Sequence, residues 1–328
     1  MLTRLRLISS AALSLALSLA LATAALAQGP DSTLPAPAEA ETEADPELVW
    51  GTDSAQVLAQ AQAQGRPVYL YVWAKYHPDC VQMAQFSLPY PRVASQLTNF
   101  ELLALDAHNP ANFAFFDQYQ VPYLKTALPG SADTQSLSQD LGAARWPTHL
   151  FLDPRGREVF RTYGFLPGQA FAEILSIVRD LFRNWEVLQT QPDSAEGEAG
   201  VGHAYLMLEV AEQARTHLER ALQLAGADQQ ALQDGVRLDL TILRLPDDPP
   251  KAQRDLQQWR EQHGGDPRAV EALYYEAVAE IASERLDRAE RLLQRFEQAQ
   301  PGTPEYESKW YAPGMLLLKL LQKPATTP

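Results

Sequence analysis

The sequence predicts an α/β domain with a central mixed sheet flanked by helices, followed by an all-α domain of helical repeats. Three observations predict this order. Apolar, β-branched runs alternate with helical stretches up to about residue 183. From Trp185 onward Ala, Leu, Gln, Glu and Arg dominate at helical spacing, and a pattern of small residues recurs there. A chain of 328 residues is long enough for two such domains.

The elements of the first domain, residues 48–183, follow from local signals. Gly65 ends an Ala- and Gln-rich helix, and a buried-type strand follows it. A turn at Asp153-Pro154-Arg155-Gly156 predicts a hairpin. The expected helices are residues 53–64, 80–86 and 171–182, and the expected strands are residues 67–73, 99–105, 148–152 and 158–163.

Composition excludes several functions. The chain has 41 Asp and Glu against 27 Lys and Arg, a net charge of −14, so it lacks the basic surface that binds nucleic acid. Cys80 is the single cysteine of the sequence. An intrachain disulfide, a zinc site with two or more cysteines and a redox cycle between two thiols are therefore excluded for this sequence. We predict no cofactor and no metal site.

The N-terminal residues are typical of an export signal. Arg4 and Arg6 precede an apolar stretch at residues 7–21, and Ala25-Leu26-Ala27 has the small-x-small pattern that signal peptidase cleaves. Residues 1–27 thus predict cleavage after Ala27 and a periplasmic or secreted protein, without other membrane contact. The alternative is an uncleaved anchor, since residues 7–27 approach spanning length. The acidic, Pro-rich residues 28–47 predict a disordered linker.

Two segments of the first domain carry a family resemblance. The segment Val72-Trp73-Ala74-Lys75-Tyr76-His77-Pro78-Asp79-Cys80 leads from a strand into a helix, and Arg145-Trp146-Pro147-Thr148 precedes a later strand. The first resembles the thioredoxin active-site segment, and the second resembles the loop whose cis-proline faces that site. Similar features occur in the C-terminal thioredoxin-like domain of the thiol transporter DsbD, which shares the segments Gly65-Arg66-Pro67, Phe86-Ser87 and Tyr163-Gly164-Phe165.

The departures from this family bear on function. His77 stands where the family has the first, attacking cysteine, and Cys80 takes the place of the second. Tyr71 aligns with the buried aspartate that assists the second cysteine in the family. The resemblance therefore implies a thioredoxin-like domain whose dithiol active site has been lost.

Three interpretations of His77 and Cys80 remain open. The first is a buried structural thiol beside a solvated histidine. The second is a reactive Cys80 that forms mixed disulfides with other proteins, its pKa lowered by His77 and the helix N-terminus. The third is copper held by His77, Cys80 and Met83, which is disfavoured because the three side chains spread around the helix and no fourth ligand is in view. His108 and His149 are expected to be structural.

A peptide-binding face is the other candidate site. The resemblance places Trp73, Tyr76, Trp146 and Pro147 around the face where thioredoxins dock an extended peptide. The alternative for Trp73 is that its side chain packs in the core instead of lying on this face. For Tyr76 and Trp146, an exposed and a packed side chain both remain open. Residues 121–139 resemble an insertion that adds a new surface beside this face.

The second domain, residues 184–328, resembles tetratricopeptide (TPR) repeats. Gly202, Tyr205, Ala214, Leu218 and Ala221 follow the family spacing of small and large residues. The second-helix pattern recurs twice, as Ala252, Leu256 and Trp259 and as Ala289, Leu293 and Phe296. The alanines lie 38 and 37 residues apart, against about 34 in the family. This predicts three helical pairs and a closing helix at residues 306–321, bent or broken at Pro313-Gly314.

These observations predict an exported adaptor that binds a protein or peptide partner and has no dithiol active site. The alternative is a thiol-disulfide oxidoreductase or redox chaperone that works through Cys80 alone. For the repeats, the alternative to partner binding is a purely structural role, in which they form a scaffold that packs on the first domain. Phosphate-binding loops, nucleophile elbows and zinc-protease motifs are absent from the sequence, which argues against other enzyme classes.

Overall fold

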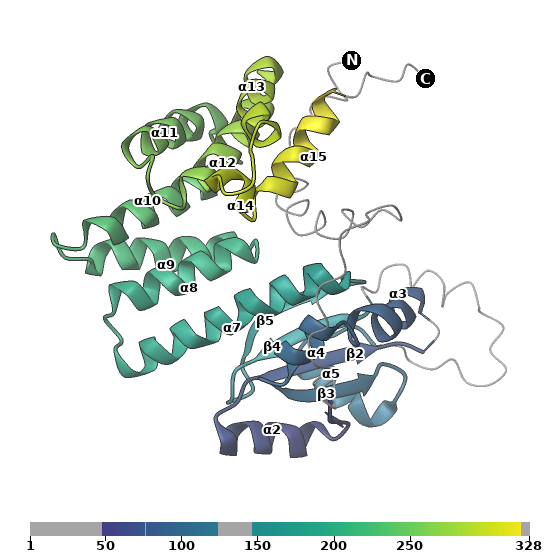
Figure 1. The fold of residues 1–328 in the computed structure, drawn as a ribbon. Coiled ribbons are helices and arrows are strands. Elements are labelled where there is room, and N and C mark those ends of the chain that lie inside the picture. The colour runs from purple at the N-terminus through teal and green to yellow at the C-terminus, as the bar shows by residue number, and fades with distance from the viewer. Residues whose placement is uncertain (1–47, 76, 124–145, 323–328) are drawn as a thin grey trace. The chain divides into compact units, whose positions relative to one another are not determined.

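The computed structural model describes residues 48–75, 77–123 and 146–322 (Figure 1). They form two compact units that meet between Phe182 and Arg183, within helix α7 (Gly168–Thr190). The predicted export signal and linker lie outside the described residues. Within the described part of the chain, no helix combines the length and apolar character needed to cross a membrane.

The first unit is built on a five-stranded mixed sheet, as predicted. Its strands lie in the order β1-β3-β2-β4-β5, and β4 and β5 run antiparallel to their neighbours. Both strands of the β4–β5 hairpin have the predicted bounds. The strands are β1 (Trp50–Gly51), β2 (Val68–Trp73), β3 (Glu101–Asp106), β4 (Thr148–Leu152) and β5 (Glu158–Tyr163).

Helices flank this sheet, and several of them have clear start and stop signals. Asp53 caps α2 by accepting hydrogen bonds from the Ala55 and Gln56 N–H groups, and Gly65 ends it in the left-handed conformation. The helices before α7 are α2 (Ser54–Gln64), α3 (Pro78–Gln82), a π-helix (Met83–Ser87), α4 (Pro91–Leu97), a 3₁₀ turn (Pro110–Asn112) and α5 (Phe113–Gln118).

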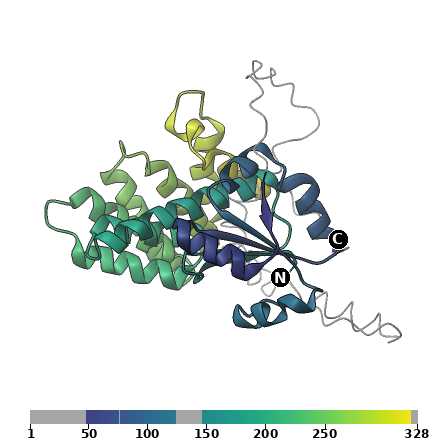
Figure 2. The same ribbon diagram turned by 90° about the horizontal axis from the view of Figure 1, so that it is seen from below.

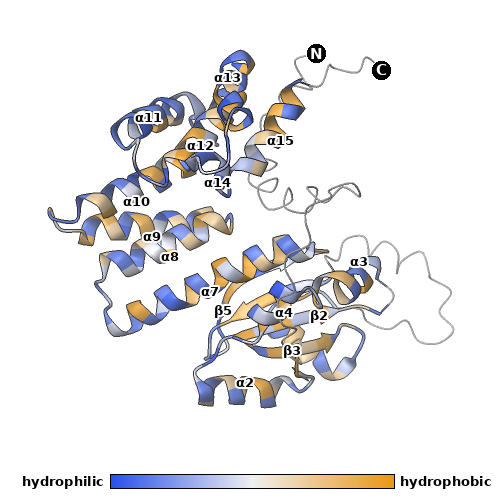
Figure 3. Ribbon diagram, viewed as in Figure 1, coloured by the Kyte–Doolittle hydropathy of each residue, from blue (hydrophilic) through white to orange (hydrophobic). Residues whose placement is uncertain are grey.

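Strand β2 lies in the middle of the sheet and is buried on both faces. Val68, Leu70 and Val72 pack in one core cluster, which also includes residues of α2 and α5. Tyr69 points to the other face and lies against Phe171 of α7, with 5.7 Å between ring centroids. The sheet strands are accordingly among the most apolar parts of the ribbon in Figure 3. This burial explains why the sequence of β2 reads as one apolar run instead of an alternation.

Some elements differ from the sequence-based expectation. The helix predicted at residues 80–86 begins at Pro78 and changes to π geometry at Met83. The closing helix predicted at residues 171–182 runs on to Thr190 as α7. Strand β1 and helices α4 and α5 were not predicted, because they are short and carry no extended periodic pattern.

The second unit consists of antiparallel helix pairs, visible in Figures 1 and 2. Its helices are α8 (Ala195–Met207), α9 (Ala211–Leu224), α10 (Gln230–Leu243), α11 (Pro249–Gln262), α12 (Ala269–Ala282), α13 (Leu286–Glu297), α14 (Pro304–Glu307) and α15 (Tyr311–Gln322). The second helices α9, α11 and α13 bury the recurrent residues that the sequence singled out. These are Ala214, Leu218, Ala221, Ala252, Leu256, Trp259, Ala289, Leu293 and Phe296.

The small residues of this pattern permit close helix approach. A Cβ atom added to Gly202 of α8 would lie 2.6 Å from Cγ of Leu218 on α9. Glycine is therefore required there by packing, although it lowers the helix propensity of α8.

The break predicted at Pro313-Gly314 is wrong, because α15 runs through both residues, and the alternative of a bend there stays a prediction. Pro313 is the third residue of α15, where the missing N–H has no partner to lose within the helix. The interruption lies between Glu307 and Tyr311, where α14 ends and α15 begins. Gly314 instead lies against Phe296, since a Cβ atom there would come within 2.7 Å of the Phe296 ring.

Two helical glycines give opposite predictions for stability. Gly202→Ala should destabilise the protein by about 1–3 kcal/mol through overpacking against Leu218. Gly235→Ala in α10 should leave stability unchanged or raise it by up to about 1 kcal/mol, because an added Cβ would lie 3.5 Å from Arg268 Nη1 and alanine favours helix. Urea unfolding of both variants measures this, and equal effects would contradict the close approach of α8 and α9.

Candidate functional site

The predicted site segments come together at one edge of the sheet in the first unit. The Trp146-Pro147 peptide bond is cis, and the Pro147 carbonyl accepts a hydrogen bond of 2.8 Å from the Gly164 N–H. A Cβ atom on Gly164 would lie 3.9 Å from Oδ2 of Asp79, so the end of β5 is close to the start of α3. Gly164 has φ +80°, which favours glycine at this point.

Cys80 lies in the first turn of α3 and faces the core. Its side chain is only 4% exposed and belongs to the cluster formed by β2, β3 and β4. Sγ accepts a hydrogen bond of 3.4 Å from the Ala74 N–H, which closes the turn between β2 and α3. Tyr71 donates its hydroxyl to the Cys80 carbonyl at 3.3 Å.

This environment raises the pKa of the Cys80 thiol to about 11. Burial is the main cause, the Ala74 hydrogen bond opposes it, and the charge of Asp79 adds to it. The prediction that His77 and the helix N-terminus lower this pKa is therefore wrong. Burial dominates, because a thiolate here would lose much of its hydration.

His77 takes the N-cap position of α3 in an extended conformation and makes no capping hydrogen bond with its side chain in the described structure. The expected solvated ring is instead half-buried, and its Nδ1 atom is buried without a partner among the described residues. Pro78 follows as the first helical residue. His77 thus starts the helix through its backbone.

The third interpretation, copper at His77, Cys80 and Met83, gains no support. Met83 is fully buried, and its sulfur accepts a hydrogen bond of 3.3 Å from the Leu166 N–H. Within the described ranges, no group of three or more His, Cys, Asp or Glu side chains is arranged to hold a metal ion.

The structure separates the aromatic residues assigned to the peptide-binding face. Trp146 is 1% exposed and packs in the core, so its ring offers no surface to a peptide and the exposed alternative is corrected. Trp73 is half-buried against the same cluster. Tyr76 lies outside the described residues, as does most of the insertion expected at residues 121–139. Pro147 keeps its expected place in the cis loop.

A buried histidine network lies behind this loop and was not foreseen beyond a structural role for His149. His149 is fully buried on β4, where its Nδ1 lies 2.7 Å from the Tyr69 hydroxyl. Its Nε2 lies 3.0 Å from the Gly164 carbonyl oxygen. A carbonyl oxygen can only accept a hydrogen bond, so Nε2 carries the proton and donates it. Burial lowers the pKa of His149 to about 4, so the ring is neutral and both nitrogens are paired.

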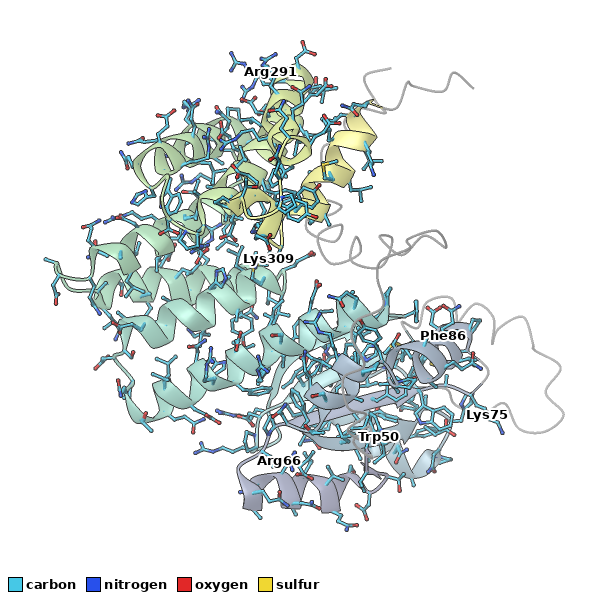
Figure 4. The ribbon with its side chains drawn as sticks, in the orientation of Figure 1. Trp50, Arg66, Lys75, Phe86, Arg291 and Lys309 are labelled. Atoms are coloured by element: carbon cyan, nitrogen blue, oxygen red, sulfur yellow. The ribbon has the colours of Figure 1, made fainter. Side chains whose placement is uncertain are left out.

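The outer surface of residues 78–87 is almost uncharged and exposes two large apolar side chains beside Gln82 and Gln85. Val81 is 43% exposed, and Phe86, labelled in Figure 4, is 64% exposed. Asp79 is the single charged residue between Pro78 and Ser87. Exposed aromatic residues and few charges are typical of protein interfaces. The sequence signal for this surface is the Phe86-Ser87 segment, whose family resemblance alone does not indicate an exposed aromatic side chain.

A family comparison agrees with this geometry. Residues 55–179 match the family model of the thioredoxin-like domain. The first unit is a thioredoxin-like domain. It carries the cis-proline loop and the strand-to-helix turn of such domains, with His77 and a buried Cys80 at the turn.

Several solved structures are similar to this chain. A thioredoxin from Thermus thermophilus is 28% identical, covers 40% of this chain and 86% of its own, and has a TM-score of 0.30. The oxidised C-terminal domain of Neisseria meningitidis DsbD is 19% identical, covers 38% of this chain and 95% of its own, and has a TM-score of 0.28. A DsbH oxidoreductase is 15% identical, covers 43% of this chain and 90% of its own, and has a TM-score of 0.25. No curated protein sequence matches the chain.

The raised pKa of Cys80 predicts slow alkylation. At pH 8 the native thiol should react with iodoacetamide at least about a hundredfold more slowly than in urea, because unfolding returns the pKa to about 8.5. The rate in urea is the control for reagent quality. Rapid native alkylation with an apparent pKa below 8.5 would contradict the burial argument and restore the reactive-thiol interpretation.

His149 predicts a specific acid sensitivity. Its folded pKa of about 4 is below the unfolded value of 6.5, so the unfolded state takes up the proton first as the pH falls. Its contribution is present above pH 6.5 and is lost between pH 6.5 and 4, a change of about 3 kcal/mol.

A matched variant isolates this contribution. The stability of the wild type relative to His149→Gln should shrink by that amount between pH 7 and 4, measured by urea unfolding at each pH. A difference that stays constant with pH would show that His149 is not held neutral.

Proposed function

We propose that this protein is an exported adaptor in which the thioredoxin-like domain no longer catalyses thiol-disulfide exchange and TPR-like repeats bind a protein partner. Export rests on the sequence pattern of residues 1–27, with Arg4 and Arg6 before the apolar stretch. The observation that carries the proposal is the burial of Cys80, the single thiol of the sequence.

The chemistry at Cys80 supports a binding role over a redox role. A nucleophilic cysteine needs a thiolate with access to its target, whereas Cys80 is buried and has a raised pKa. The residue at the attacking position of the family is His77, which cannot form a disulfide. The alternative, a single-thiol oxidoreductase or redox chaperone, needs an opening of the β2–α3 turn before Cys80 can react.

The helical pairs support a binding role for the second unit. Three successive pairs, α8–α9, α10–α11 and α12–α13, repeat the same buried positions, which is how stacked repeats form a continuous core. Stacked repeats of this type present the first helix of each pair along an extended surface. We place partner binding on α8, α10 and α12 for this reason.

The adaptor proposal predicts that Cys80 is dispensable. Cys80→Ser should retain partner capture when the purified wild type and variant are crosslinked side by side in an extract of the exported fraction. Both proteins should also fail to accelerate insulin reduction by dithiothreitol above the background rate. Thioredoxin is the positive control for the second assay.

Two results would sink the adaptor proposal. One is loss of the captured partner in Cys80→Ser, provided that the variant unfolds at the wild-type urea concentration. The other is wild-type acceleration of insulin reduction that disappears in the variant. Either result would establish the redox alternative.

A further inference from the structure

A cavity of about 320 Å³ lies among the first helices of the second unit. Its walls come from α8, α10 and the residue preceding α12. The side chains that matter for its chemistry are Glu196 and His203 on α8, Asp239 on α10 and Arg268. No residue of the thioredoxin-like domain lines it, so the cavity is a property of the repeats alone.

Asp239 is the most deeply buried charge of this cavity, with a side chain only 3% exposed. Both of its carboxylate oxygens lie 3.2 Å from His203 Nδ1, and Arg268 Nη2 donates to Oδ1. Burial alone would raise the pKa of Asp239, but attraction to His203 and Arg268 lowers it below its usual value. The carboxylate is therefore ionised at neutral pH.

Arg268 makes three hydrogen bonds within the protein, one from each of its side-chain nitrogens. Its Nε donates to Glu271 Oε2 at 2.7 Å, and its Nη1 donates to the Gly235 carbonyl at 3.2 Å. Together with the Asp239 contact, these bonds direct the guanidinium toward helix groups. An anion entering the cavity would have to compete with two carboxylates for this one cation.

The charges around the cavity do not balance. Glu196, Asp239 and Glu271 carry three negative charges, against the positive charge of Arg268 and, when it is protonated, that of His203, so at least one negative charge is left over. Glu271 Oε1 is buried and has no hydrogen-bond partner among the described residues. Because the carboxylates of Asp239 and Glu271 are buried, the remaining negative charge favours a cation from outside.

The other walls of the cavity are small or apolar, and suit an aliphatic chain. They are formed by Ala199, Gly200, Ala231, Leu232, Gly235 and Val236. Lysine and arginine combine an aliphatic stem with a cationic head, so their stems pack on apolar surface while the head reaches a polar partner. The cavity has this order of surfaces, with the carboxylate of Asp239 in its lining and Glu196 exposed to solvent.

We infer that this cavity is a subsite for a lysine or arginine side chain of an extended partner peptide. The inference rests on the proposed adaptor function and specifies the partner as a basic peptide. The peptide would lie across α8 and α10, the first helices of two successive pairs, with its cation near Asp239 and Glu196.

The probe for the test is a short Gly/Ser/Ala peptide with blocked ends and one central lysine. Its matched control carries Nε-acetyl-lysine at that position, which keeps the length and removes the charge. Binding to the full chain is followed by NMR titration of ¹⁵N-labelled protein. The lysine peptide should bind at least about tenfold more tightly, and the difference should shrink at 0.5 M salt.

A cavity-filling variant tests the location. Gly235→Leu should project a side chain into the cavity, because an added Cβ meets no atom closer than Arg268 Nη1 at 3.5 Å. The substitution also improves helix propensity, so stability should be kept. We expect it to weaken lysine-peptide binding at least about tenfold.

The matched control is Gly265→Leu, where an added Cβ has no described neighbour within 4 Å. This variant should bind the lysine peptide like the wild type. Glu196→Gln, which removes an exposed charge at the cavity, should weaken binding about two- to threefold without unfolding the protein.

The outcomes separate this inference from the adaptor proposal. Equal binding of the lysine and acetyl-lysine peptides, undiminished binding to Gly235→Leu, or no binding at millimolar peptide would overturn the basic-peptide subsite. Preference for a glutamate-containing peptide would overturn it as well. In each case, partner capture that persists in Cys80→Ser would leave the adaptor proposal standing on another surface.

Discussion

The hydrogen bond from the Ala74 N–H to Cys80 Sγ closes the turn between β2 and α3, and the rest of the candidate site depends on it. With the sulfur directed inward, the thiol acts as a small apolar group of the core. The raised pKa of the thiol follows from this burial. Cys80 therefore contributes to the packing of the first unit.

The second unit relies on charge pairs in a place where a core usually has apolar side chains. Helix α12 buries Glu271, Glu276 and Glu280, and each contacts an arginine outside its own helix. Such pairs add little net stability, but removal of one partner leaves a buried charge and is costly. The pair of Arg260 with Glu276 therefore restricts which face of α11 can lie against α12.

Local patterns predicted much of the fold, but not the environment of individual side chains. The hairpin at residues 148–163 was predicted because turn residues and β-branched strands are adjacent in the sequence. The three buried alanine patterns were likewise visible as a repeat. The burial of Trp146, the raised pKa of Cys80 and the charges around Asp239 could not be predicted, since each depends on residues distant in the sequence. Helices α4 and α5 were missed because they are too short to display a period.

The exposed face of the site depends on the number of residues in the π-helix Met83–Ser87. At the two ends of this segment, Met83 Sδ accepts a hydrogen bond from the Leu166 N–H and the Ser87 hydroxyl donates one to the Leu166 carbonyl. Phe86, between them, is exposed. A π segment corresponds to an α-helix with one inserted residue. Loss of one codon here would rotate the downstream residues by about 100° around the helix axis. The length of the segment therefore determines which side chains are exposed, as much as their identity does. A deletion or insertion of one residue can change this exposed set in a way that a point substitution cannot.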